Sequence, residues 1–162
     1  MFHYRKAFTL VELLVVVAII GLLAGITVIS VNSIRTKGRD VRRVGDLKQL
    51  YKLLAIYAND MSGETLGDCT TGSVIQLCTK PADPAPALPF DFKAFKDPTG
   101  TLACTATSTS PCQYAMGKAP KTDDYEVCFF LETDNNPVGN RGLYHLITDG
   151  SMLPGCSNIP QQ

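Results

Sequence analysis

The chain has 162 residues, enough for one modest domain and an additional segment but not for two full domains. Fifteen Lys and Arg residues balance fifteen Asp and Glu residues, so the formal net charge of zero indicates no particular partner. The way residues are distributed along the chain is more informative than their totals.

The first part of the chain contains one long apolar run. Residues 1–7 (MFHYRKA) are short and basic, and residues 8–31 include a single charged residue, Glu12. At about 1.5 Å per residue, a helix of this length crosses a hydrocarbon core of about 30 Å. A charge within such a span costs about 2.5–3.5 kcal/mol, so Glu12 needs a compensating partner. A secretory signal peptide remains an alternative, because small residues between 21 and 30 could form its cleavage site.

Residues 35–60 continue the helix with a different pattern. Apolar residues recur at alternating spacings of three and four, which predicts an amphipathic helix: Val44, Leu47, Tyr51, Leu54 and Ala58. No proline precedes residue 81, so we predict one helix from about residue 8 to about residue 60. Its part up to residue 34 is apolar on all sides, and its part from residue 35 is apolar on one side.

Residues 61–162 are predicted to form a small globular β head. The segment YEVCFFLE (125–132) alternates as a half-buried strand does, with residues 113–117 and 143–148 as candidate neighbours. Neither the strand nor the helix can bury its apolar side alone, so the two should pack together. The contacting residues would be Val44, Leu47, Tyr51 and Leu54 of the helix and Val127, Phe129 and Leu131 of the strand. The predicted fold class is α+β, a long N-terminal helix on a small antiparallel sheet with disulfides.

Six cysteines lie in this head: Cys69, Cys78, Cys104, Cys112, Cys128 and Cys156. An even number in a small, loop-rich segment favours disulfides and an oxidising compartment. Six cysteines allow 15 pairings. The short loops Cys69–Cys78 and Cys104–Cys112 are plausible, which leaves Cys128–Cys156, but the sequence does not choose among the pairings.

The sequence offers little for catalysis. Only two histidines are present, His3 and His145, and His145 on a predicted strand is best explained as structural. Zinc-binding spacings are absent from the sequence. Glu132, Asp134 and Asn136 alternate as calcium ligands can, but the twelve-residue calcium loop is not matched. We expect no enzymatic activity, no cofactor and no bound metal.

A basic cluster follows the apolar run and consists of Arg35, Lys37, Arg39, Arg42 and Arg43. A solvated or interfacial face beside a membrane explains it better than contact with nucleic acid. The excess of basic residues after the span would place the C-terminal part in the cytoplasm, whereas the cysteines favour the opposite side. We follow the cysteines. Gly21 and Gly25 form a small-xxx-small pair of the kind that lets membrane helices approach one another.

The N-terminal segment RKAFTLVELLVVVAIIGLLAG resembles the N-terminus of type IV pilins and of type II secretion pseudopilins. Their hallmarks fall here on basic Arg5 and Lys6, on Ala7 at the cut, on Phe8, and on the T-L-x-E run ending at Glu12. Two positions differ from the usual family pattern, which has glycine where this chain has Ala7 and, in many members, proline where it has Ile29. The acidic calcium loop of the major secretion pseudopilin is not recognisable in residues 147–153.

The resemblance implies a leader at residues 1–7, a membrane-spanning and filament-core helix at 8–34, an amphipathic helix at 35–60 and a head at 61–162. A prepilin peptidase would cut between Ala7 and Phe8 and methylate the new amine of Phe8. An inner-membrane platform with an ATPase would then move subunits from lipid into a helical homopolymer. Phe8, Glu12, Gly21 and Gly25 would act in assembly, with the Glu12 carboxylate against the Phe8 ammonium of an adjacent copy.

The resemblance thus predicts a structural subunit of a type IV pilus or a related filament. It would be a single-pass inner-membrane protein with its head outside, and later part of an extracellular filament. The alternatives are a pseudopilin of a type II secretion system and a bitopic membrane protein whose head binds a ligand. The residues do not distinguish among adhesion, twitching motility, DNA uptake and protein secretion.

Overall fold

The computed structural model describes residues 8–60, 66, 69–78, 91–118 and 121–156. The chain divides into two compact units, Met1–Thr36 and Lys37–Gln162, which we describe separately. The leader predicted at residues 1–7 lies outside the described residues.

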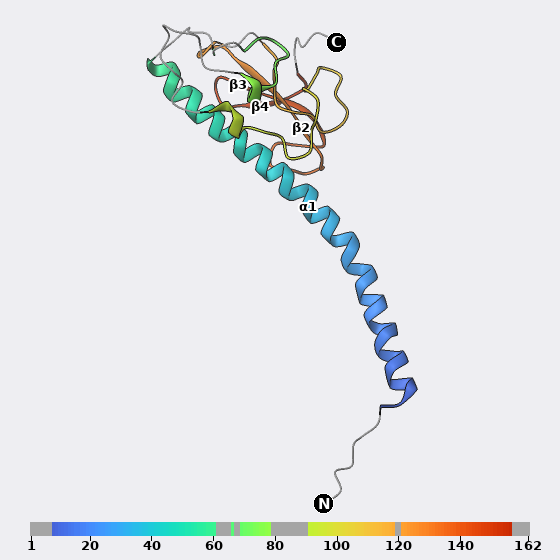
Figure 1. The fold of residues 1–162 in the computed structure, drawn as a ribbon. Helices are drawn as coiled ribbons and strands as arrows, with labels where there is room; N and C mark the ends of the chain where they lie inside the picture. Colours follow the sequence, from blue (N-terminus) through green and yellow to red (C-terminus); the bar gives the residue numbers. More distant parts are fainter. Residues whose placement is uncertain (1–7, 61–65, 67–68, 79–90, 119–120, 157–162) are drawn as a thin grey trace, which may run out of the picture. The chain divides into compact units, whose positions relative to one another are not determined.

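Helix α1 comprises Leu10–Asp60 and contains residues of both units (Figure 1). It agrees with the single helix expected from about residue 8 to about residue 60. Gly38 and Gly45 do not interrupt it, although each costs about 1 kcal/mol relative to alanine in a helix interior. Among the described residues, no helix combines the length and the apolar character that crossing a membrane requires.

The head unit contains one four-stranded antiparallel sheet (Figure 1). The strands are β1 (Ala115–Met116), β2 (Glu126–Leu131), β3 (Gly142–Ile147) and β4 (Met152–Pro154), and they lie in the order β1-β2-β3-β4. β2 pairs with β3 along its whole length, from Glu126 opposite Ile147 to Leu131 opposite Gly142. The sequence pattern predicts β1, β2 and β3 but not β4, which has only three residues.

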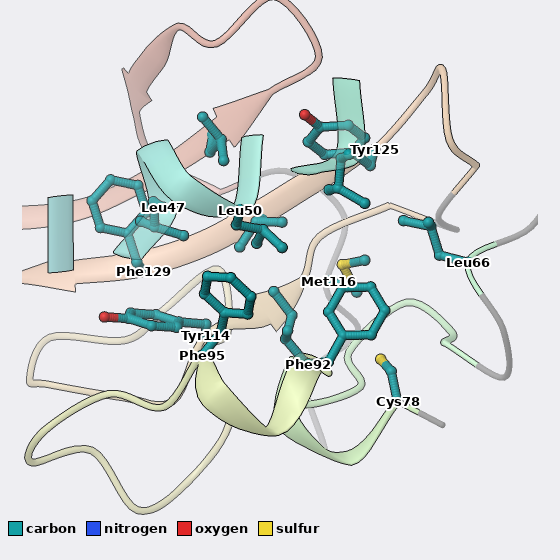
Figure 2. Close-up of a cluster of buried hydrophobic side chains, with 14 of the residues drawn as sticks. Leu47, Leu50, Leu66, Cys78, Phe92, Phe95, Tyr114, Met116, Tyr125 and Phe129 are labelled. Atoms are coloured by element: carbon teal, nitrogen blue, oxygen red, sulfur yellow. The ribbon is translucent and has the colours of Figure 1, made fainter. Parts of the chain in front are cut away.

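The main core lies between α1 and one face of the sheet. Val44, Leu47, Leu50, Leu54 and Tyr57 of α1 are buried with Val127, Phe129 and Leu131 of β2, while Tyr51 is partly buried against them. Figure 2 shows Leu47 and Leu50 near Phe129 in this cluster, with Phe92, Phe95 and Tyr114 closing it on the side of the loops. The predicted packing of the helix stripe on the strand face is therefore confirmed.

The opposite face of β2 is buried as well, which the sequence analysis did not predict. A second, smaller cluster consists of Cys104, Cys112, Ala115, Cys128 and Phe130. It forms because the loop between residues 100 and 113 packs its disulfide-bonded cysteines against this face, and a bridge between Ala103 and Gln113 pairs the two ends of the loop with each other. All six residues of β2 are consequently buried, and the alternation seen in the sequence separates two cores rather than a core from solvent.

Candidate processing and assembly site

Helix α1 begins with a reciprocal cap formed by Thr9 and Glu12. The backbone N–H and the hydroxyl of Thr9 donate to Oε2 of Glu12 over 2.9 and 2.8 Å, and the N–H of Glu12 donates to the Thr9 hydroxyl oxygen over 3.3 Å. This is a capping box, in which the residue before the helix and the third helical residue satisfy each other's backbone donors. The T-x-x-E spacing was visible in the sequence, but the capping role of Glu12 was not recognised.

The cap uses only one oxygen of the Glu12 carboxylate. Among the described residues no donor reaches Oε1, so this oxygen can accept a hydrogen bond from outside the chain. Phe8, directly before the cap, is 82% exposed. The site therefore consists of an exposed aromatic residue followed by a carboxylate that is held in place but only partly used.

The helix after this cap exposes apolar side chains on every side. From residue 8 to residue 25 no described side chain is buried, and Leu10, Val11, Leu14, Ile20, Leu22 and Leu23 are each more than half exposed. A monomeric soluble protein rarely leaves so large an apolar surface uncovered. A Cβ added at Gly21 or Gly25 would meet nothing within 4 Å, so packing within the chain does not require glycine at either position.

The basic cluster divides into exposed and buried members: Arg35, Lys37 and Arg42 are exposed, Arg39 is partly buried and Arg43 is buried. Arg43 is fully buried and Asp40 and Asp97 are 1% exposed, so these charges lie inside the head. The Arg43 guanidinium donates to Asp97 over 2.5 and 3.1 Å, to Asp40 over 2.8 Å and to Glu132 over 2.6 Å. The interpretation as a face beside a membrane is therefore wrong for Arg43, because three carboxylates compensate its charge inside the protein.

Arg39 and Asp40 connect the same region of α1 to the end of β2. Arg39 donates two hydrogen bonds to Glu132, over 2.8 and 2.6 Å. Asp40 accepts hydrogen bonds from the backbone N–H groups of Glu132 and Thr133 and from the Thr133 hydroxyl, over 2.9, 2.8 and 2.6 Å. These charges hold α1 and the end of β2 together.

The electrostatics of this network follow from its hydrogen bonds. Burial alone would lower the pKa of the Arg43 guanidinium, but the hydrogen bonds and charge of Asp97, with Glu132 and Asp40, raise it. The two hydrogen bonds from Arg39, followed by the one from Arg43, lower the pKa of Glu132 to about 2 against the opposing effect of burial. Each charged group thus stabilises the charged form of its partner.

The oxygens considered as calcium ligands have other partners. Glu132 binds the two arginines, Asp134 accepts a hydrogen bond from the Arg141 N–H, and Asn136 Oδ1 accepts hydrogen bonds from the N–H groups of Val138 and Gly139. They build the turn between β2 and β3. Elsewhere in the described head, Glu126, Cys128 and Cys156 have ligand atoms within 4.8 Å of one another, but both cysteines are in a disulfide and their sulfurs are not thiolates.

The head contains three disulfides, Cys69–Cys78, Cys104–Cys112 and Cys128–Cys156. These are the pairs that the short-loop argument suggested. His145 lies opposite Cys128 on β3, and its Nδ1 is 2.8 Å from the carbonyl oxygen of Gly155, next to Cys156. This contact fits the structural role expected for the histidine.

Residues 2–28 match a family model described as the prokaryotic N-terminal methylation motif. Neither the curated proteins nor the solved structures compared with this chain gave a match. The matched residues include the Thr9–Glu12 cap and the first part of the exposed apolar helix. The chain therefore carries the prepilin-type N-terminal motif of type IV pilins and pseudopilins.

Proposed function

We propose that the chain is a structural subunit of a type IV pilus or of a related pseudopilus, and that it polymerises through the N-terminal part of α1. The observation that carries this proposal is the N-terminal methylation motif on a helix whose apolar side chains are exposed all round. Such a surface must be covered either by lipid or by other apolar helices. In a subunit that is first anchored in the inner membrane and later packed in a filament core, lipid covers this surface before assembly and other apolar helices cover it afterwards.

In this proposal, processing between Ala7 and Phe8 creates the partner that Glu12 needs. The new amine of Phe8 keeps its positive charge after methylation. The ammonium of an adjacent copy would bind the Glu12 carboxylate, whose Oε2 is already oriented by Thr9. In an apolar core an uncompensated carboxylate costs several kcal/mol, so the pair would select the correct offset between neighbouring helices more than it would add net stability.

Gly21 and Gly25 would allow close approach of these helices. Their neighbourhood is open in the single chain, so the glycines would serve contacts between copies rather than within one copy. Prepilin peptidase and an assembly platform with its ATPase would be the partners during processing and export. The head would lie outside the inner membrane, where its three disulfides can form.

The mass of the mature N-terminal peptide tests the processing step. We expect a chain that begins at Phe8 and carries one additional methyl group. A chain that still begins at Met1, or one cut near Gly25 as a secretory signal would be, would contradict the proposal. Electron microscopy of sheared surface material then distinguishes a filament subunit from a bitopic protein with a binding head, because only the subunit predicts fibres that contain this chain.

A pilus subunit and a secretion pseudopilin share this N-terminal chemistry, so the motif supports both equally. A secretion pseudopilin should be needed for release of exported proteins, whereas a pilus subunit should be needed for surface fibres at ordinary expression. Deleting the gene and measuring both properties in the same strain separates the two candidates.

A further inference from the structure

The loop that the Cys104–Cys112 disulfide closes differs in composition from the rest of the head. It lies within residues 98–117, the longest stretch without Asp, Glu, Lys or Arg between residue 35 and the C-terminus. Residues 105–111 of this stretch read TATSTSP, and we call them the hydroxyl loop. Segments rich in Ser and Thr with Pro are typical of O-glycosylated stalks. The composition thus fits a surface that is hydrated by attached sugar instead of by charged side chains.

The base of the hydroxyl loop is fixed on the head. The N–H of Cys104 donates to the carbonyl oxygen of Gln113 over 2.9 Å, and the N–H of Gln113 donates to the carbonyl oxygen of Leu102 over 2.7 Å. Cys104 and Cys112 are buried in the second core, and their Cα atoms are 4.9 Å apart. None of the residues between these two cysteines is buried. The hydroxyl loop is therefore accessible along its whole length while both of its ends are anchored.

The hydroxyl groups of this loop fall into two sets. The N–H of Thr105 donates to Oγ of Ser108 over 2.9 Å, and the N–H of Ser108 donates to the carbonyl oxygen of Thr105 over 3.1 Å. The Thr107 hydroxyl lies 3.4 Å from that of Thr105. Thr109 and Ser110 are exposed, and their hydroxyls form no hydrogen bond with any described residue. The loop thus uses Thr105 and Ser108 to hold its shape and leaves Thr109 and Ser110 available for reaction.

Exposure alone does not define an acceptor, because exposed hydroxyls occur elsewhere on the head, for example on Thr148. The hydroxyl loop differs in joining a run of hydroxyl residues to a stretch without charge. A phosphate group there would carry a charge of about −2, and no Lys or Arg within residues 98–117 would compensate it. A neutral sugar needs no such cation. The surroundings along the chain therefore favour a sugar over a phosphate.

We propose that Thr109 and Ser110 are acceptors for O-linked glycosylation by a glycosyltransferase that uses a sugar diphosphate. The hydroxyl oxygen forms a bond to C1 of the sugar and the bond from C1 to the diphosphate oxygen breaks. The diphosphate leaves as an anion and the hydroxyl proton is released. The attached sugars supply the hydration that charged side chains supply on other protein surfaces. The inference goes beyond the proposed filament function and does not depend on polymerisation.

One tryptic peptide contains the whole hydroxyl loop and allows a direct test on the full-length chain purified from its own host. It runs from Asp97 to Lys118, because trypsin cuts after Lys96 and next after Lys118. We expect this peptide to be heavier by the mass of one or more sugar residues, and electron-transfer fragmentation should locate that mass on Thr109 or Ser110. An unmodified peptide, a mass that corresponds to phosphate, or sugar on other residues alone would overturn the inference.

Paired substitutions show whether the two free hydroxyls are the acceptors. Thr109→Ala with Ser110→Ala should abolish the added mass, whereas Thr109→Ser with Ser110→Thr should keep it, because both hydroxyls remain. Thr105→Ala with Ser108→Ala is the matched control, since it removes as many hydroxyls from the same loop but only those that bond within it. The control should keep the added mass. Loss of the mass in the control, or its persistence in the first variant, would contradict the assignment.

The peptide mass also separates this inference from the filament proposal. Cells that form no fibres but contain the glycosylated chain would contradict the filament proposal and support the glycosylation. Fibres built from a chain whose hydroxyl loop is unmodified would support the filament proposal and overturn the glycosylation.

Discussion

At Arg43, five hydrogen bonds satisfy a guanidinium that is entirely enclosed by the head. Its acceptors are two oxygens of Asp97 and one oxygen each of Asp40, Glu132 and Thr99. An arginine has five N–H donors, so none remains without a partner at this site. Since hydrogen bonds also bring the end of β2 to Asp40, the position of α1 on the sheet depends on charges as well as on apolar contacts.

Replacing Arg43 should therefore strongly lower the stability of the head. Arg43→Met leaves the buried Asp97 and Asp40 without their cation, and we expect a loss of about 3–5 kcal/mol in the free energy of unfolding of the head. Denaturant titration of the detergent-solubilised full chain measures it. Arg42→Met is the matched control, because Arg42 is mostly exposed and lies 3.7 Å from Asp46, a surface pair worth about 0–1 kcal/mol. Equal losses in the two variants would contradict the role assigned to Arg43.

Glu132 should make the head sensitive to acid. Its pKa is lowered from 4.5 to about 2 in the folded chain, so the folded state favours the ionised form. The resulting stabilisation is fully present above pH 4.5 and is lost as the pH falls from 4.5 towards 2. Glu132→Gln should be less stable than the wild type at pH 6, and the gap should narrow by pH 3. Thermal melts of both chains across this range check the prediction, and a constant gap would refute it.

Among the elements, those with strong apolar periodicity could be predicted and those set by charge could not. The stripe from Val44 to Leu54 and the alternation in β2 located the main core correctly. A core predicted from apolar periodicity contains only apolar residues and leaves charged residues at the surface. The burial of Arg43 and Asp97 inside the head could therefore not be predicted in this way. β4 was missed because three residues, of which Leu153 and Pro154 are exposed, give no periodic pattern. The second core could not be predicted because the loop after Gly100 buries the second face of β2, and periodicity within the strand does not reveal such a cover.

The disulfides close chain loops of different lengths, so removing them should lower the free energy of unfolding by different amounts. Cys128–Cys156 spans 28 residues and ties β2 to the segment after β4, whereas Cys104–Cys112 spans 8. In the loop-entropy model, removing them costs about 3.5 and about 2.5 kcal/mol. Replacing each pair by alanines and measuring unfolding under oxidising conditions tests the order. The reverse order would mean that the packing of Cys104 and Cys112, rather than chain entropy, dominates.

For the whole molecule, the central question is how a carboxylate is accommodated in an apolar helix, and the structure adds a second answer to the one expected from the sequence. Within a single chain Glu12 caps the helix through Thr9. In a filament it would also bind the Phe8 ammonium of a neighbour. The two roles differ in what they require, because a cap needs only a hydrogen-bond acceptor, whereas the contact between copies needs a negative charge.

Two substitutions at Glu12 separate these roles. Glu12→Gln keeps an acceptor for Thr9 but removes the charge, and Glu12→Ala removes both. If the charge governs assembly, both variants should insert in the membrane and both should form few fibres. If capping alone matters, Glu12→Gln should assemble like the wild type. Membrane fractionation together with quantitative blotting of sheared fibres measures the two steps, and Thr9→Ala, which weakens the cap but keeps the charge, serves as the control. Normal fibre yield from Glu12→Ala would remove Glu12 from the assembly mechanism altogether.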